Sequence, residues 1–236
     1  MSHADRDAGK VAHVNRGTRY RRAASNFMLG VALGLLAYYG LTTLLGALAQ
    51  SGLRTENAGV QAFASERPDD RLMPGDASTL DFEGWEGEDL AFWTVLPAGE
   101  VFGRIVIEPI ELDALVIKGV APADLRRGPG WIDWSDLPGP TGTCGISGHR
   151  TTYGAPFGRI GELEPGDTID LYSPYRRYRY EVTRTLIVRP DQSEVVASTE
   201  EPTLTLTACH PPYSARYRIA VQADLIEVRR IQSQEE

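Results

Sequence analysis

The chain has 236 residues, of which 42% are hydrophobic and 24% are charged, and its formal net charge is −8. This composition excludes a collagen-like repeat, a fully disordered chain and a polytopic membrane protein. An acidic chain without a basic stripe is also a poor nucleic-acid binder, because neutralisation of phosphates supplies most of that affinity.

The N-terminal part of the chain predicts a membrane anchor. Residues 27–49 carry no charge, and a helix of this length would rise roughly 34 Å, enough to cross the ~30 Å hydrocarbon core of a bilayer. Residues 1–24 hold six basic and two acidic side chains, so the positive-inside rule keeps this end in the cytoplasm and sends the remainder across. We therefore expect a basic cytoplasmic tail over residues 1–24 and a single-pass transmembrane signal-anchor over residues 25–50. The alternative is a signal peptide cleaved after Ala49, which the length of the apolar run disfavours.

Residues 51–97 predict an acidic stalk that ends in a short helix. Between residues 66 and 89 there are nine acidic and two basic side chains, and prolines and glycines interrupt any helix. Such a stretch is typical of a solvated linker. A short amphipathic helix that carries Leu90, Phe92 and Trp93 is expected after it.

From about Pro97 onward the pattern changes to short β-type runs separated by Gly, Pro and Asp turns. Few segments have helical periodicity, and residues 121–127 are one candidate for a helical turn. Seven or eight short strands with regular turn signals predict a mostly β fold, either a closed barrel or a sandwich. The expected strands cover residues 101–107, 115–120, 144–147, 168–172, 178–188, 203–208 and 218–228.

Few pairs of a cysteine and a histidine are available for nucleophilic chemistry in this β-rich part. The cysteines are Cys144 and Cys209, and only His149 and His210 follow the expected anchor. A thiol nucleophile needs a proton-transfer partner, usually an imidazole, brought near it by the fold. Cys209 ends a run of alternating Thr and Leu, where a reactive group can be displayed at a loop. His210 is a poor partner for Cys209, because successive side chains on a strand point to opposite faces, which leaves His149.

The residues alone leave other interpretations of the two cysteines open. A lone cysteine is more often a small buried hydrophobe than a nucleophile. A disulfide between Cys144 and Cys209 is compatible with an oxidising exterior. A zinc site is not expected, because the cysteines and histidines lack the CxxC or HxxxH spacing of metal ligands. We expect no metal and no cofactor.

Several ordered motifs resemble one known family. Residues 205–209, Thr-Leu-Thr-Ala-Cys, are similar to the TLxTC signature of sortases, the membrane-anchored transpeptidases of bacterial surfaces. Residues 145–157 resemble the segment around the sortase catalytic histidine, most closely its class E and class D versions, and residues 125–130 resemble the loop that precedes it in those classes. Residues 209–221 resemble the C-terminal block with its essential arginine. The likeness covers roughly residues 98–228.

The resemblance implies a fold and a domain order. We expect a closed sortase-type β-barrel of about eight strands with short helices, preceded by one N-terminal transmembrane helix. The catalytic domain would cover residues 98–230 and a short tail residues 231–236. Cys144 stands where relatives carry an ordinary apolar residue, so it is interpreted as a buried core thiol.

The resemblance also implies roles for individual residues. Cys209 would be the nucleophile and His149 the acid–base catalyst. Arg218 would hold the developing oxyanion or the substrate backbone, because in class E the functional arginine directly precedes the apolar strand run. Arg216 is the alternative, since residues two apart face the same side of a continuous strand and periodicity cannot choose between them.

Two residues before the nucleophile complete the expected site. Thr207 and Ala208 are predicted to bind substrate, together with Arg216. The family usually has Thr directly before the nucleophile, where this chain has Ala208. This departure bears on the preferred substrate sequence rather than on the nucleophile.

The activity implied by the resemblance is that of a cysteine transpeptidase. It would cleave an LPxTG- or LAxTG-like sorting signal at the Thr carbonyl through a thioester and transfer the protein to a cell-surface amine. The expected partners are secreted proteins with a C-terminal sorting signal, an amine acceptor (a peptidoglycan precursor or a pilin lysine) and the membrane. The alternatives are a secreted, membrane-tethered cysteine protease and a surface binding module without catalysis.

Overall fold

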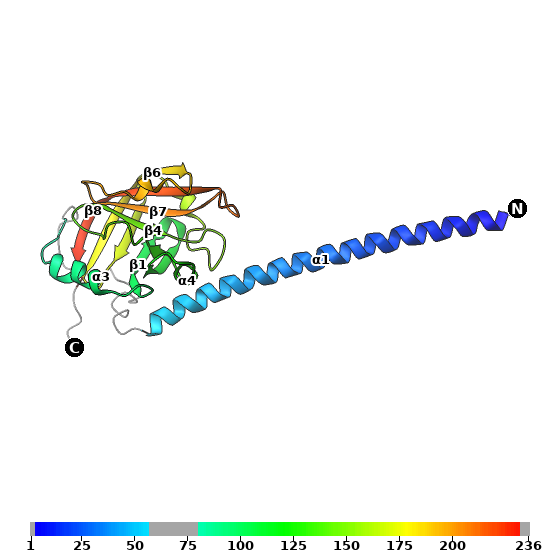
Figure 1. The fold of residues 1–236 in the computed structure, drawn as a ribbon, viewed down its shortest axis with the longest axis horizontal. Helices are drawn as coiled ribbons and strands as arrows, with labels where there is room; N and C mark the ends of the chain where they lie inside the picture. Colours follow the sequence, from blue (N-terminus) through cyan, green and yellow to red (C-terminus); the bar gives the residue numbers. More distant parts are fainter. Residues whose placement is uncertain (1–2, 57–79, 232–236) are drawn as a thin grey trace. The chain divides into compact units, whose positions relative to one another are not determined.

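The computed structural model describes residues 3–56 and 80–231 (Figure 1). It divides into two compact units, residues 1–42 and residues 43–236. The helix α1 (His3–Glu56) extends beyond both ends of the expected anchor. Within it, Tyr20–Thr55 is long and apolar enough to cross a membrane. Large apolar side chains such as Phe27, Leu35 and Leu36 are exposed on α1, as expected of a helix that contacts lipid.

The second unit contains a closed barrel, as the sequence predicted (Figure 1). Its strands are neighbours in the order β1-β2-β3-β4-β7-β8-β6-β5. Closure leaves no strand edge unpaired. In chain order the strands are β1 (Val101–Ile107), β2 (Leu112–Lys118), β3 (Gly130–Trp131), β4 (Thr143–Ser147), β5 (Thr168–Tyr172), β6 (Arg176–Val188), β7 (Thr203–His210) and β8 (Tyr217–Arg230).

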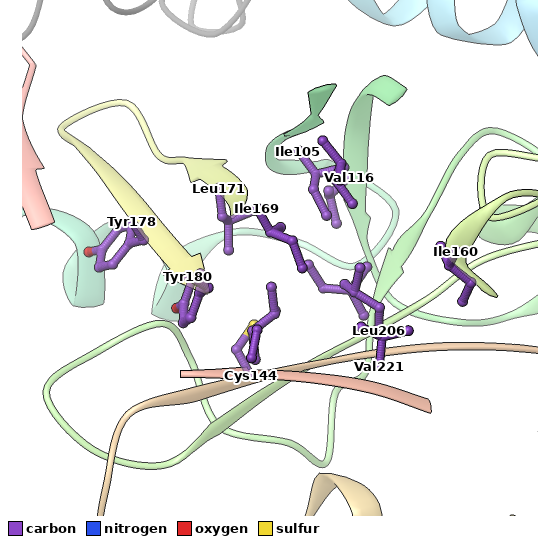
Figure 2. Packing of buried hydrophobic residues seen from close by; sticks show 14 of the residues in the cluster. Ile105, Val116, Cys144, Ile160, Ile169, Leu171, Tyr178, Tyr180, Leu206 and Val221 are labelled. Atoms are coloured by element: carbon purple, nitrogen blue, oxygen red, sulfur yellow. The ribbon is translucent and has the colours of Figure 1, made fainter. Parts of the chain in front are cut away.

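The barrel interior is filled by alternate side chains of these strands. Figure 2 shows Leu206 of β7 and Val221 of β8, which are direct partners in the β7–β8 ladder, among the core side chains with Ile105 and Ile169. All four belong to one cluster of buried apolar residues. Because side chains alternate across a strand, the residues between these core positions on β7 face the outside of the barrel. That outer face of β7 carries Thr205, Thr207 and Cys209.

Short helical segments lie between the strands. They are the π-helical turn η3 (Glu86–Leu90), α3 (Ala91–Val95), α4 (Pro122–Leu125) and the 3-10 turns η4 (Glu108–Ile110), η5 (Ile160–Glu162) and η6 (Ser193–Val196). The turn η6 covers the outer face of β7, where the Thr205 hydroxyl donates to the carbonyl of Val195 at 2.8 Å. Thr205 is therefore fully buried although it points away from the core.

The end of the expected stalk packs onto the barrel. Trp93 of α3 is fully buried and stacks on Phe102 at 5.0 Å between ring centroids. The carboxylates of Glu88 and Asp89 pair with Arg176, whose side chain is fully buried. These acidic residues bind the barrel rather than solvent, so the folded domain begins before residue 98. The part of the expected stalk at residues 57–79 lies outside the described residues.

Strands β1 and β5 have the expected ends, whereas the other expected strands differ at one or both ends by one to three residues. The two-residue strand β3 was not predicted. The end of a strand depends on how far the neighbouring strand pairs with it, and this pairing cannot be derived from the local sequence. In β3, a Cβ on Gly130 would collide with the carbonyl oxygen of Gly119. Glycine there lets two backbone segments approach closely.

Candidate active site

Strands β4 and β7 bring His149 and Cys209 to neighbouring positions. The two strands are parallel and paired from Thr143 with Thr203 to Ser147 with Thr207. The amide of Gly148 then donates to the carbonyl of Thr207 at 3.0 Å. The Nη1 of Arg150 donates to the carbonyl of Cys209 at 3.3 Å. Bonds from the residues on both sides of His149 therefore bring its backbone close to the end of β7 that carries Cys209, although 60 positions separate the two residues in the chain.

Strand β8 brings Arg218 to the other side of Cys209. The two residues are direct partners in the antiparallel β7–β8 ladder. Side chains of directly opposed residues lie on the same face of a sheet. The Arg218 guanidinium also donates to the carbonyls of Ala215 and Tyr217, at 3.2 and 3.1 Å. Cys209 thus lies opposite Arg218 on one side of β7, and on the other side β7 pairs with β4, the strand that precedes His149.

Arg216 lies outside this ladder. Strand β8 begins at Tyr217, so the argument from a continuous strand does not reach Arg216. Its side chain is exposed and packs over the ring of Tyr217, 5.3 Å from the centroid. Of the two candidate arginines, only Arg218 is opposite Cys209 in the backbone pairing of β7 with β8.

Thr207 and Ala208 point to opposite sides of β7. Thr207 lines a pocket on the outer face, whereas Ala208 is 2% exposed and belongs to the core cluster. The alternation of the strand places Thr207 and Cys209 on one face and Ala208 on the other. Ala208 does not face the pocket, so its side chain can influence substrate only through the packing beneath β7.

The pocket beside Cys209 has a volume of about 290 Å³. Ser147, Thr207 and Arg218 form its floor from β4, β7 and β8, and the segment after β6 forms a wall. Trp134 stands at its rim with 66% of its surface exposed. The lining also includes the apolar residues Val120, Leu125, Ile132, Val188, Pro190, Val195 and Val196 and the polar residues Arg189, Gln192 and Ser193. A pocket that combines apolar side chains with polar groups suits a peptide segment.

His149 is half-buried against the loop that follows it. Its ring lies 5.1 Å from the ring of Tyr153, at an interplanar angle of 39°. Burial lowers the pKa of His149 below its usual value, and the positive charge of Arg126 lowers it further. Both causes disfavour the imidazolium, so a proton placed on this ring is readily passed on.

Sequence reasoning missed Arg150, the residue after His149. Its Nη1 donates to the carbonyl oxygen of Cys209 at 3.3 Å and lies 2.8 Å from Nδ1 of His210. Burial lowers the pKa of Arg150, and the charge of the nearby Cys209 opposes that effect. His210 is therefore engaged with Arg150. The sequence signal for Arg150 was only its place beside His149.

The two cysteines have different surroundings, and both are free thiols. Cys144 is buried in the barrel core, where burial and the charge of Asp136 raise its pKa. Cys209 is partly exposed, and the disulfide that the sequence left open is not formed. Among residues 3–56 and 80–231, no group of three or more His, Cys, Asp or Glu side chains could hold a metal ion.

Comparison with known proteins identifies relatives of the barrel. The model of the Sortase domain matches residues 105–226, more than half of the chain. Sortase D of Bacillus subtilis is 34% identical over 114 residues, which cover 48% of this chain and 56% of that protein. Sortase SrtE1 of Streptomyces coelicolor is 31% identical over 97 residues, which cover 37% of this chain and 28% of that protein. The chain thus matches about half or less of the length of these relatives.

A solved structure shares the fold. Sortase E1 from Streptomyces coelicolor, determined with a tripeptide in the active site, superposes with a TM-score of 0.54 at 25% sequence identity. The superposition covers 56% of this chain and 91% of that one.

Proposed function

Because the chain belongs to the sortase family, we propose that it is a cysteine transpeptidase acting on secreted proteins that carry a C-terminal sorting signal. One observation supports the proposal, namely that Cys209 is the direct partner of Arg218 in the β7–β8 ladder, while β7 pairs on its other side with β4, which ends two residues before His149. A nucleophile, a proton-transfer group and a fixed cation are the three parts that acyl transfer needs.

In the first half-reaction the Cys209 thiolate attacks the Thr carbonyl of an LPxTG- or LAxTG-like signal. The carbonyl π electrons move to oxygen, and the Arg218 guanidinium, charged at any working pH, donates hydrogen bonds to that oxyanion. The C–N bond then breaks, and the leaving amine takes a proton from the His149 imidazolium. The products are a thioester on Cys209, a neutral His149 and the released C-terminal fragment.

In the second half-reaction an amine on the cell surface attacks the thioester. Neutral His149 accepts the proton that the amine loses, and the C–S bond breaks to return the Cys209 thiolate. The cycle leaves a new amide bond and no net oxidation. A peptidoglycan precursor or a pilin lysine would supply the amine. One covalent intermediate shared by two half-reactions predicts ping-pong kinetics.

The pocket beside Cys209 would hold the residues of the sorting signal that precede the Thr. Its apolar wall suits the leucine of the signal, and Thr207 lies on its floor next to the nucleophile. Trp134 at the rim offers an aromatic face to the residue after that leucine.

We also propose that α1 anchors the barrel to the membrane with the basic N-terminus in the cytoplasm. Substrate and enzyme would then be confined to one surface layer, which raises their effective concentration. Protease treatment of intact spheroplasts tests this orientation. The chain carries an epitope tag added at its N-terminus. Digestion of the barrel with retention of this tag supports the proposed orientation, whereas loss of the tag with retention of the barrel contradicts it.

The activity is tested with the full chain in detergent micelles. LPxTG and LAxTG peptides are supplied with and without a glycine-based amine, and the products are separated by mass. We expect an amide-linked product that depends on the amine and disappears in Cys209→Ala. Cys144→Ala is the matched control, because it removes the other thiol from the core and should keep the activity. Hydrolysis alone, unaffected by the amine, would instead indicate a protease, and turnover by Cys209→Ala would exclude Cys209 as the nucleophile.

A further inference from the structure

The loop that carries His149 contains unusual backbone geometry. Tyr153, Gly154 and Ala155 have positive φ angles of 52°, 79° and 45° in succession. A non-glycine residue in this region costs on the order of 1 kcal/mol or more, and such residues persist only where their surroundings enforce them. Two of these three residues are not glycine, so the fold holds this loop in a shape that the chain would not adopt alone.

Hydrogen bonds fold the loop back over its own start. The amide of Phe157 donates to the carbonyl of His149 at 3.0 Å, and the amide of Ala155 donates to the carbonyl of Thr152 at 2.9 Å. Phe157 is fully buried in the core cluster and fixes the far end of the loop. The turn thereby brings the Tyr153 ring to the imidazole of His149, with 5.1 Å between ring centroids.

A second element reaches the same tyrosine from outside the loop. Arg126, the residue after α4, places its guanidinium carbon 5.9 Å from the centroid of the Tyr153 ring. Cations are attracted to the face of an aromatic ring at this distance. Arg126, Tyr153 and His149 therefore form a series from the protein surface to the proposed acid–base group.

We propose that Tyr153 is a positioning residue for His149, which fixes the plane of the imidazole, and that Arg126 holds Tyr153 in place. The inference rests on the proposed function, because it assigns His149 the proton-transfer role. It deepens that function by naming the two side chains that prepare the imidazole. Neither residue touches the reacting atoms.

The charges around His149 agree with this arrangement. The positive charge of Arg126 adds to burial in lowering the pKa of His149. Two other ionisable side chains lie on the same loop, namely Tyr153 against the imidazole and Arg150, which bonds to the carbonyl of Cys209 on β7. Arg126 is the charged group that contacts the Tyr153 ring.

The first test measures the titration of His149 directly, without any substrate. The full chain in micelles is labelled on its histidine rings, and the His149 signal is assigned by its loss in His149→Gln. Arg126→Gln should move the midpoint to higher pH, because a repelling charge is removed, whereas Arg126→Lys should stay close to the wild type. Arg159→Gln is the matched control, since Arg159 is an exposed arginine that pairs with Glu162. Equal midpoints in the wild type and Arg126→Gln would mean that Arg126 does not act on His149, and would contradict its place in the proposed series.

The second test measures turnover in Tyr153 variants. Tyr153→Ala should lower kcat about tenfold with little change in KM, since a misplaced catalytic group costs rate rather than binding. Tyr153→Phe keeps the ring and should retain most of the activity. Tyr213→Ala is the matched control, because Tyr213 also has a positive φ of 65° but is 86% exposed.

The outcomes separate this inference from the proposed function. Absence of turnover in the wild type would refute the transpeptidase proposal, and the titration of His149 would still test Arg126. Turnover in the wild type with an unchanged kcat in a folded Tyr153→Ala would refute the positioning role alone. If Tyr153→Ala fails to fold, Tyr153→Leu provides the same comparison with more of the packing volume kept.

Discussion

Strands β4 and β7 lie side by side, yet the two cysteines they carry meet opposite environments. Cys144 points into the barrel and is 1% exposed, and its pKa is raised by burial. Cys209 lies near the end of β7 on the outer face, partly exposed and opposite Arg218. Successive side chains of a strand point alternately into the barrel and to its outer face. The face on which a cysteine lies therefore determines whether its thiol packs in the core or is available for reaction.

The largest expected difference between the two regions is thiol accessibility. Iodoacetamide should label Cys209 in the folded full chain, whereas Cys144 should react only when the barrel opens. Global opening costs about 5–15 kcal/mol, so the two rates should differ by at least about 10³-fold. Peptide mapping by mass spectrometry measures both rates in one sample. Comparable labelling of Cys144 under native conditions would contradict the description of the core.

The next effect concerns the two arginines near the outer face. Arg218→Gln should lower kcat/KM by about 10²-fold or more, as expected when a donor to an oxyanion is lost. Arg216→Gln removes an equal charge two residues away, outside the β7–β8 ladder, and should stay within about threefold of the wild type. Steady-state kinetics with one sorting-signal peptide measures both. Equal losses in the two variants would mean that net charge, rather than placement opposite Cys209, matters.

A smaller effect is expected at the rim of the pocket. Trp134→Ala should raise KM by about tenfold or less, because it removes apolar contact area from bound peptide. It should leave the thermal stability unchanged, since most of the Trp134 side chain is exposed. The matched core variant is Phe102→Ala, which removes a fully buried ring and should cost about 3–5 kcal/mol of stability. An unaltered KM in the Trp134→Ala variant would show that Trp134 does not contact the bound peptide.

The smallest effect is on the pH dependence of stability. The pKa of His149 is lower in the folded chain than in the unfolded chain, so the unfolded state binds more protons between the two values. Stability should therefore fall as the pH drops through this window, below the ordinary value of about 6.5. His149→Gln removes this contribution, and its melting temperature should fall less between pH 7 and 5 than that of the wild type, by roughly 1–2 °C. An identical pH dependence in both proteins would contradict the direction of the shift.

The sequence was sufficient for the parts of the fold that depend on local pattern. The alternating Thr and Leu of residues 203–207 predicted both β7 and the face on which its side chains lie. Turn residues between the apolar runs predicted seven or eight strands in a barrel or a sandwich, and the resemblance to sortases selected the closed barrel that the structure shows. The uniformly apolar stretch at residues 27–49 predicted a membrane-spanning helix, and the described part of α1 is a candidate span.

Features that depend on pairing between distant segments could not be predicted in the same way. Periodicity left Arg216 and Arg218 equivalent, and only the ladder with β7 distinguishes them. The acidic run before residue 90 indicated a solvated linker, because nothing local shows that Arg176 is buried opposite it. Arg150 escaped notice for the same reason, since its partner carbonyl belongs to Cys209 on another strand.

The central claim is that Cys209 carries the acyl group between a sorting signal and an amine. The most direct measurement is the intact mass of the full chain after mixing with an LPxTG peptide and rapid acid quenching, followed by peptide mapping. The account predicts an added acyl mass located on Cys209, which disappears when an amine is added and appears instead on that amine. An enzyme that turns over the peptide without any adduct on Cys209, or whose adduct no amine can discharge, would contradict it.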